Sequence, residues 1–160
     1  MLLLAYDTSG REGGIALAQC EGDACNVLDE VAVSGGTFSA QLVPQTSELL
    51  RKHGFSATDI GALVVAGGPG SFTGLRIGLV AAMGLAEALQ KPIAAISVLE
   101  AMAWGVADGS VIAALDASRK EAYVGEYGPR PQQDSRTASV ADGAGESLTR
   151  QSLGNDGGLR

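Results

Sequence analysis

Three short apolar segments at the start of the chain, joined by polar turns, constrain the fold more than any other feature. Leu2–Ala5 is continuously apolar, as in a buried strand, and Asp7-Thr8-Ser9-Gly10 has the composition of a turn. Further strands are expected at Gly14–Cys20 and Asn26–Val33, with Glu21-Gly22-Asp23-Ala24 as the hairpin loop between them. Strands this closely spaced predict an antiparallel meander.

Alternating helices and strands follow the meander. A helical spacing of apolar residues begins at Leu42 and ends at Gly54, with Pro44 near its start. The segments after it are expected to be a strand at Ala62–Ala66, a helix at Leu75–Leu89, a strand at Ile93–Ile96 and a helix at Val98–Val106. A meander that leads into parallel β-α units is the ribonuclease-H-like topology, which actin-like ATPases use twice. The predicted fold class is therefore α/β: an actin-like first lobe with a mixed sheet and flanking helices.

A second lobe begins late in the chain. Strands are expected at Val111–Leu115 and Glu121–Tyr127, around a turn at Asp116–Lys120. Residues 128–160 hold few large apolar residues, which cannot offset the entropic cost of ordering them. We expect a first lobe over 1–109, the start of a second over 110–127 and a disordered tail over 128–160.

Composition excludes several functions. The formal net charge of −7 disfavours independent binding of nucleic acid. Cys20 and Cys25 could face one another in the hairpin, and the expectation is two reduced thiols. The single histidine, His53, argues against a metal site. No leader segment and no apolar stretch of membrane-spanning length is recognised, so a cytoplasmic location is expected.

The turn Asp7-Thr8-Ser9 is the first candidate for chemistry. In actin-like enzymes an acidic residue at this place orients a metal, while backbone donors and hydroxyls hold a phosphate. An ordinary Asx turn is the structural alternative. Asp116 could mirror Asp7 in a second lobe or belong to a solvated turn.

The segment Gly67–Gly78 lies between a predicted strand and a predicted helix, where phosphate loops occur. It lacks the Gly-Lys-Ser/Thr ending of a P-loop and misses the dinucleotide fingerprint by one residue. A tight turn that only glycine permits is therefore the favoured interpretation.

Small residues recur every four positions along the following helix, at Gly74, Gly78, Ala82 and Ala86. Such a ridge permits close approach of another element. It could pack on the protein's own sheet. However, large apolar residues surround much of the helix, which favours burial on most sides and hence a docking surface for a partner subunit.

Four blocks together resemble one family: Asp7-Thr8-Ser9, Gly68–Gly78, Ser97-Val98-Leu99-Glu100-Ala101 and Ala114-Leu115-Asp116-Ala117 are similar to the bacterial TsaB (YeaZ-like) proteins, from Met1 to about Tyr127. The resemblance implies an actin-like fold without catalytic competence. It also implies a role as a non-catalytic scaffold for TsaD, which transfers threonylcarbamoyl to N6 of adenosine 37 in tRNA. A TsaE-like ATPase joins that complex, and homodimers form through the same helices.

Carried onto this sequence, the partner surface falls on Leu42–Leu50 and Leu75–Leu89. The residues expected there are Leu42, Thr46, Leu50, Leu75, Gly78, Leu79, Ala82, Met83 and Ala86, whereas Asp7, Thr8, Ser9 and Asp116 form a weaker nucleotide-binding set. No cofactor is expected to be required by this chain, with any ATP or ADP at the partner interface. No catalytic residue is assigned, and tRNA is expected to be met only through the complex.

Two departures from the family stand out. Phe38 occupies a place where many members have histidine, and Met83 one where many have lysine. Residues 128–160 do not look like the family's second lobe. The competing hypothesis is an autonomous actin-like ATPase or phosphotransferase that uses Asp7 and Asp116. Peptidase activity lacks a nucleophile–base pair in this sequence.

Overall fold

The computed structural model describes residues 1–22, 24–106, 109–118, 120–128 and 149–152. The chain divides into two compact units, Met1–Val98 and Leu99–Arg160, so the division comes before the boundary predicted at residue 109. Each unit is described by itself.

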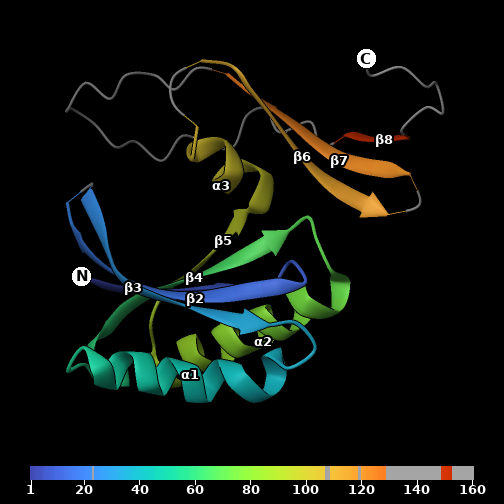
Figure 1. Ribbon diagram of the computed structural model, residues 1–160. Helices are drawn as coiled ribbons and strands as arrows, with labels where there is room; N and C mark the ends of the chain where they lie inside the picture. Colours follow the sequence, from blue (N-terminus) through green and yellow to red (C-terminus); the bar gives the residue numbers. More distant parts are fainter. Residues whose placement is uncertain (23, 107–108, 119, 129–148, 153–160) are drawn as a thin grey trace. The chain divides into compact units, whose positions relative to one another are not determined.

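The first unit is a five-stranded mixed sheet in the order β3-β2-β1-β4-β5 (Figure 1). Its strands are β1 (Leu2–Asp7), β2 (Glu12–Glu21), β3 (Ala24–Ser34), β4 (Ile60–Gly68) and β5 (Ile93–Ser97). β1, β2 and β3 are antiparallel neighbours, whereas β4 runs parallel to both β1 and β5. The predicted meander followed by parallel β-α units is confirmed, and the fold is the ribonuclease-H-like, actin-like first lobe.

Two helices cover one face of this sheet (Figure 1). These are α1 (Phe38–Lys52) and α2 (Phe72–Leu89), while a short 3-10 turn (Ala57–Asp59) leads into β4. Alternate residues of the strands point toward the helices and form the core, which is built around Leu4, Ile15, Leu17, Leu63 and Val65. A core made mostly of aliphatic side chains fits a sequence with 4% aromatic residues.

Helix α1 begins earlier than the apolar spacing predicted. It starts at Phe38, with Pro44 inside its second turn. Phe38 is buried and packs with the core, so the helix gains an apolar anchor in its first turn. At its other end, Lys52 and His53 both bind the carboxylate of Asp29 on β3, at 2.6 and 2.8 Å.

The second unit contains helix α3 (Val98–Trp104), except for the first residue of that helix, and a three-stranded antiparallel sheet. The strands β6 (Val111–Ser118), β7 (Glu121–Tyr127) and β8 (Thr149–Ser152) occur in that order. The turn predicted at Asp116–Lys120 is shorter than expected because β6 continues to Ser118.

Strand β8 corrects one expectation for the C-terminal segment. Thr149–Ser152 pairs with Glu121–Val124 of β7, although 128–160 was predicted to be a disordered tail. Ladder hydrogen bonds to an existing strand can order a segment poor in apolar residues. Residues 129–148 and 153–160 of that predicted tail lie outside the described residues.

The two cysteines form a disulfide, so the prediction of reduced thiols is wrong. Cys20 on β2 lies directly opposite Cys25 on β3 in the hairpin register, with 4.0 Å between their Cα atoms. The sequence placed them face to face, but the expected compartment argued against oxidation.

One helix among the described residues, α2, is long and apolar enough to cross a membrane by length and composition alone. The same measure fits a helix that packs on a sheet, and α2 packs on β4 and β1.

Candidate functional site

The glycine-rich segment closes over the turn that follows β1. The amide of Ser71, which caps α2, donates to the carbonyl of Ser9 at 2.7 Å. The Ser71 hydroxyl accepts a hydrogen bond from the amide of Gly74 at 3.3 Å. Gly68, which precedes a cis peptide bond to Pro69, has φ +108°, where a side chain is disfavoured. The glycines thus permit a tight turn, as the sequence indicated.

Thr8 is fully buried beneath this turn. Its hydroxyl donates to the carbonyl of Gly74 at 2.8 Å. A Cβ at Gly74 would overlap the Thr8 carbonyl, and one at Gly78 would overlap the Thr8 hydroxyl. Glycine is therefore needed at both positions because α2 lies directly against the turn.

Asp7 and Ser9 complete the turn. The amide of Ser9 donates to Oδ1 of Asp7 at 2.8 Å, so the Asx turn is confirmed. The Asp7 side chain is exposed, whereas Thr8 and Ser9 are buried. Asp116 lies on β6 in the second unit, opposite Ala122. Nucleotide binding by these four residues stays a prediction.

The small-residue ridge of α2 faces inward, not outward. Gly74, Gly78, Ala82 and Ala86 are the four buried residues of the helix, and the two alanines belong to the core. The prediction that this ridge is a docking surface is therefore wrong. Small residues recur there because the helix approaches the first strand and its turn closely.

The predicted residues on α1 are also buried. Leu42 and Leu50 lie in the core. The Thr46 hydroxyl donates to the Leu42 carbonyl at 2.7 Å and shares a hydrogen bond of 2.8 Å with the Tyr6 hydroxyl. Burial raises the pKa of Tyr6, and its hydrogen bond to Thr46 partly opposes that shift. These side chains hold α1 on the sheet and offer no free surface.

Large apolar side chains nevertheless point to solvent from both helices. We call these exposed residues the α1–α2 face: Val43 (66% exposed), Phe72 (75%), Leu79 (40%), Val80 (69%) and Met83 (53%). Leu79 and Met83 were predicted from sequence, while Leu75, predicted with them, is half-buried. Val43 and Val80 fall within the predicted ranges but were not among the residues named, and Phe72 was missed, although its position off the small-residue ridge could have indicated it.

A groove of about 370 Å³ lies beside this face. Its lining comes from the first turn of α1 and from α2: Ser39, Thr73, Arg76, Ile77, Val80 and Ala81. The Arg76 guanidinium lies 5.4 Å from the centroid of the Phe72 ring, a cation–π distance. The groove is thus apolar with one cation at its side.

Metal ligands do not gather in the described part of the chain. No group of three or more His, Cys, Asp or Glu side chains there could hold an ion. His53, the sole histidine, binds Asp29 instead.

These features define a class of protein: a ribonuclease-H-like, actin-like lobe whose first turn is packed under a glycine loop and whose two helices expose an apolar face. The comparisons with known proteins identify the family. A family model described as "TsaD: tRNA N6-adenosine threonylcarbamoyltransferase" matches residues 32–157. The chain therefore belongs to this family, and it is TsaB-like (YeaZ-like) within it.

Relatives from several bacteria support this placement. The chain is 36% identical over 129 residues to the Bacillus subtilis "tRNA threonylcarbamoyladenosine biosynthesis protein TsaB", covering 79% of this chain and 55% of that protein. It is 37% identical over 131 residues to the Escherichia coli protein of the same name, with the same coverage. The structure of "YeaZ from Pseudomonas aeruginosa" superposes with a TM-score of 0.67 at 31% identity, covering 81% of this chain and 61% of that one.

The extent of these matches bears on the C-terminal segment. The chain spans about half the length of the curated relatives it matches. The family model extends to residue 157, so residues 128–157 fall within the family match, contrary to the expectation of an unrelated tail.

Proposed function

We propose that this chain is an accessory, non-catalytic subunit in the synthesis of threonylcarbamoyladenosine in tRNA. Its partner in this proposal is a TsaD-like catalytic subunit, and the α1–α2 face is the docking surface. The names of its relatives support the pathway. The exposed apolar side chains of α1 and α2 support the docking role, and they are the observation on which the proposal rests.

The arrangement of the exposed residues on α2 favours a partner site. Phe72, Leu79, Val80 and Met83 recur at spacings that place them along one side of a helix. Single exposed apolar residues are normal, but a contiguous group marks a surface that another molecule covers. α1 packs beside α2, which extends this surface to Val43.

The packing of the first turn favours an accessory role over an autonomous ATPase. The hydroxyl of Thr8 and the amide of Ser9 are used in hydrogen bonds to the Gly74 carbonyl and the Asp7 carboxylate. An ATPase of this fold would instead turn such groups toward a phosphate and stabilise the transferred phosphoryl from both lobes. The ATPase alternative therefore rests on Asp7 and Asp116 alone.

Further partners follow from the same proposal. A TsaE-like ATPase joins the complex, and any ATP or ADP binds at the partner interface. Because the chain carries a net charge of −7, tRNA is contacted through the complex rather than by this chain alone. A second copy could use the α1–α2 face when no TsaD-like subunit is present. The proposed location is the cytoplasm, where tRNA is modified.

Co-purification with a TsaD-like subunit tests the proposal. Met83→Glu places a charge within the α1–α2 face, and we expect the affinity to fall about 30-fold, as for loss of about 2 kcal/mol at an interface hot spot. Val27→Glu is the matched control, because Val27 on β3 is 59% exposed but lies outside the face. The control should bind like the unmodified chain.

Two results would contradict the proposal. If Met83→Glu and Val27→Glu bind the TsaD-like subunit with equal affinity, the docking surface does not lie on the α1–α2 face. If the unmodified chain does not bind the TsaD-like subunit, the proposed accessory role is wrong. Light scattering of the chain alone distinguishes self-association, which Met83→Glu should also weaken.

A further inference from the structure

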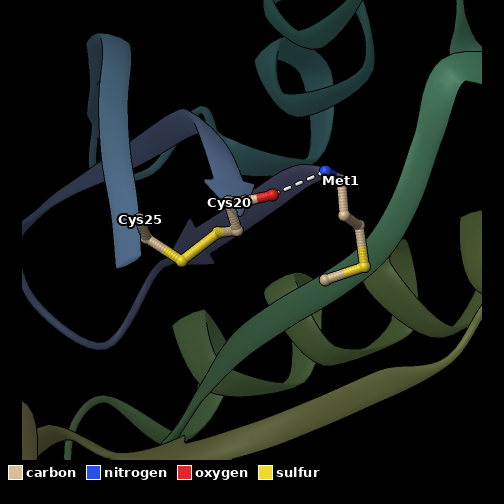
Figure 2. The surroundings of a disulfide bond; sticks show 3 residues. All are labelled: Met1, Cys20 and Cys25. Atoms are coloured by element: carbon tan, nitrogen blue, oxygen red, sulfur yellow. Dashed lines mark hydrogen bonds between the residues drawn. A yellow bond between two sulfur atoms is a disulfide. The ribbon is translucent and has the colours of Figure 1, made fainter. Parts of the chain in front are cut away.

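The disulfide lies at the last position where β2 is still paired on both sides. Gln19 of β2 pairs with Leu2 of β1, whereas the next residue, Cys20, reaches only Met1 on that side. The Met1 ammonium donates to the Cys20 carbonyl at 2.6 Å (Figure 2), and the Cys20 amide donates to the Met1 carbonyl at 2.8 Å. The Met1 side chain in turn lies against Gly61 of β4. Cys20 is thus held on the sheet side independently of the disulfide.

Cys25 lacks a comparable set of contacts among those described. It lies near the start of β3, the edge strand of the sheet, and is exposed, whereas Cys20 is 6% exposed. A register shift interrupts the β2–β3 ladder between Leu17 and Ala18, so residues 18–21 and 24–27 form a short ladder at the hairpin tip. Because β3 is the edge strand, residues 24–27 are held by this short ladder on one side only, and so short a ladder is weakly stable. The covalent link therefore holds the β3 side of the tip.

The part of β3 beyond the register shift has another anchor. Asp29 binds Lys52 and His53 at the end of α1. This link does not involve the disulfide. Breaking the disulfide should consequently loosen residues 24–27 and leave residues 29–34 in place.

We propose that Cys20 and Cys25 form a reversible redox site that switches the hairpin tip between a clamped and a loosened state. The reductant is a low-molecular-weight thiol of the glutathione class, and the disulfide of that thiol is the oxidant that re-forms the Cys20–Cys25 bond by the reverse exchange. Its thiolate attacks the exposed Cys25 sulfur, the S–S bond breaks, and Cys20 leaves as a thiolate that takes a proton from water. A second thiolate attacks the thiol-derived sulfur of the mixed disulfide and releases Cys25, which is protonated. Overall, two thiols become one disulfide, and the protein disulfide gains two electrons and two protons.

Thiol trapping in glutathione buffers of graded redox potential tests the chemistry. We expect the full chain to pass from no alkylated cysteine to two alkylated cysteines within the range of potentials that glutathione buffers, and to return to the oxidised form when the buffer is made more oxidising. A disulfide that stays unreduced across the series in the native protein would overturn the proposal. So would two thiols that stay reduced in the most oxidising buffer.

Hydrogen exchange tests the conformational consequence. On reduction, we expect amide exchange at residues 24–27 to rise at least tenfold, with residues 29–34 and β1 unchanged. The double variant Cys20→Ser, Cys25→Ser is the control: it should exchange like the reduced chain with or without thiol. Unchanged exchange at 24–27 on reduction, or an equal rise throughout the sheet, would overturn the proposed local switch.

Discussion

The packing of α2 on Thr8 predicts opposite effects for two glycine-to-alanine substitutions in one helix. At Gly78 a new Cβ would overlap the Thr8 hydroxyl and come within 3.4 Å of the Thr8 Cβ. At Gly84 a new Cβ would meet nothing within 4 Å. The two positions share a helix and the same change of helix propensity, so Gly84→Ala isolates the effect of the contact.

The size of the effect follows from three contributions. Overpacking a buried site costs about 1–3 kcal/mol. Displacing Thr8 breaks its buried hydrogen bond to the Gly74 carbonyl, which costs about 1–3 kcal/mol more. Replacing glycine by alanine inside a helix returns about 1 kcal/mol. We therefore expect Gly78→Ala to lower the free energy of unfolding by about 3 kcal/mol and Gly84→Ala to raise it by about 1 kcal/mol.

Urea unfolding of both variants measures these free energies, and a double-mutant cycle locates the cause. Removing the Thr8 hydroxyl with Thr8→Ala opens space for the new Cβ, so Gly78→Ala should cost much less in that background. If Gly78→Ala stabilises the chain as much as Gly84→Ala does, α2 does not pack on Thr8 and the inward assignment of the ridge is refuted. An equal cost with and without the Thr8 hydroxyl would place the strain elsewhere.

Two further predictions concern links between α1 and the sheet. Hydrogen bonds from Lys52, the larger cause, and from His53 lower the pKa of Asp29 to about 2. Their contribution to the stability of the fold is therefore present above the unfolded-state pKa of 3.8 and is lost as the pH falls through about 2. Thermal unfolding should therefore show Asp29→Asn less stable than the unmodified chain at pH 5, with the difference closing toward pH 2; a constant difference would exclude this origin. Tyr6→Phe should cost about 1 kcal/mol in urea unfolding, because Thr46 loses one of its two hydrogen bonds. It should also remove a loss of stability above pH 10, since burial raises the pKa of Tyr6; the same alkaline loss in both proteins would contradict this.

The topology could be predicted because its signals are local. Short apolar segments separated by Asp7–Gly10 and by Gly22 specify strands and turns without knowledge of distant contacts. The start of α1 was misplaced because its anchor, Phe38, stands apart from the apolar spacing that begins at Leu42. Strand β8 was missed for a related reason: it is ordered by pairing with β7, which leaves little trace in its own composition.

The candidate site was harder to predict, because helical spacing identifies faces but not their direction. The sequence correctly grouped Gly78 and Ala82 on one side of α2. Large apolar residues surround much of this helix, so hydrophobicity alone could not distinguish the inner side from the outer side. The deciding contact joins Gly78 to Thr8, which is far away in the sequence.

The inward ridge and the outward apolar face have one physical cause. For α2 to lie against the turn at Thr8, the contacting positions must be glycine, and the next two ridge positions are alanine; both residue types bury little apolar area of their own. The larger residues Val80 and Met83 are then left on the solvent side, where their hydrophobic surface stays exposed to water. Because α2 is so apolar and much of it is exposed, the chain is more stable when another molecule covers Val80 and Met83. Close packing within the lobe thus generates the surface at which we place the partner subunit.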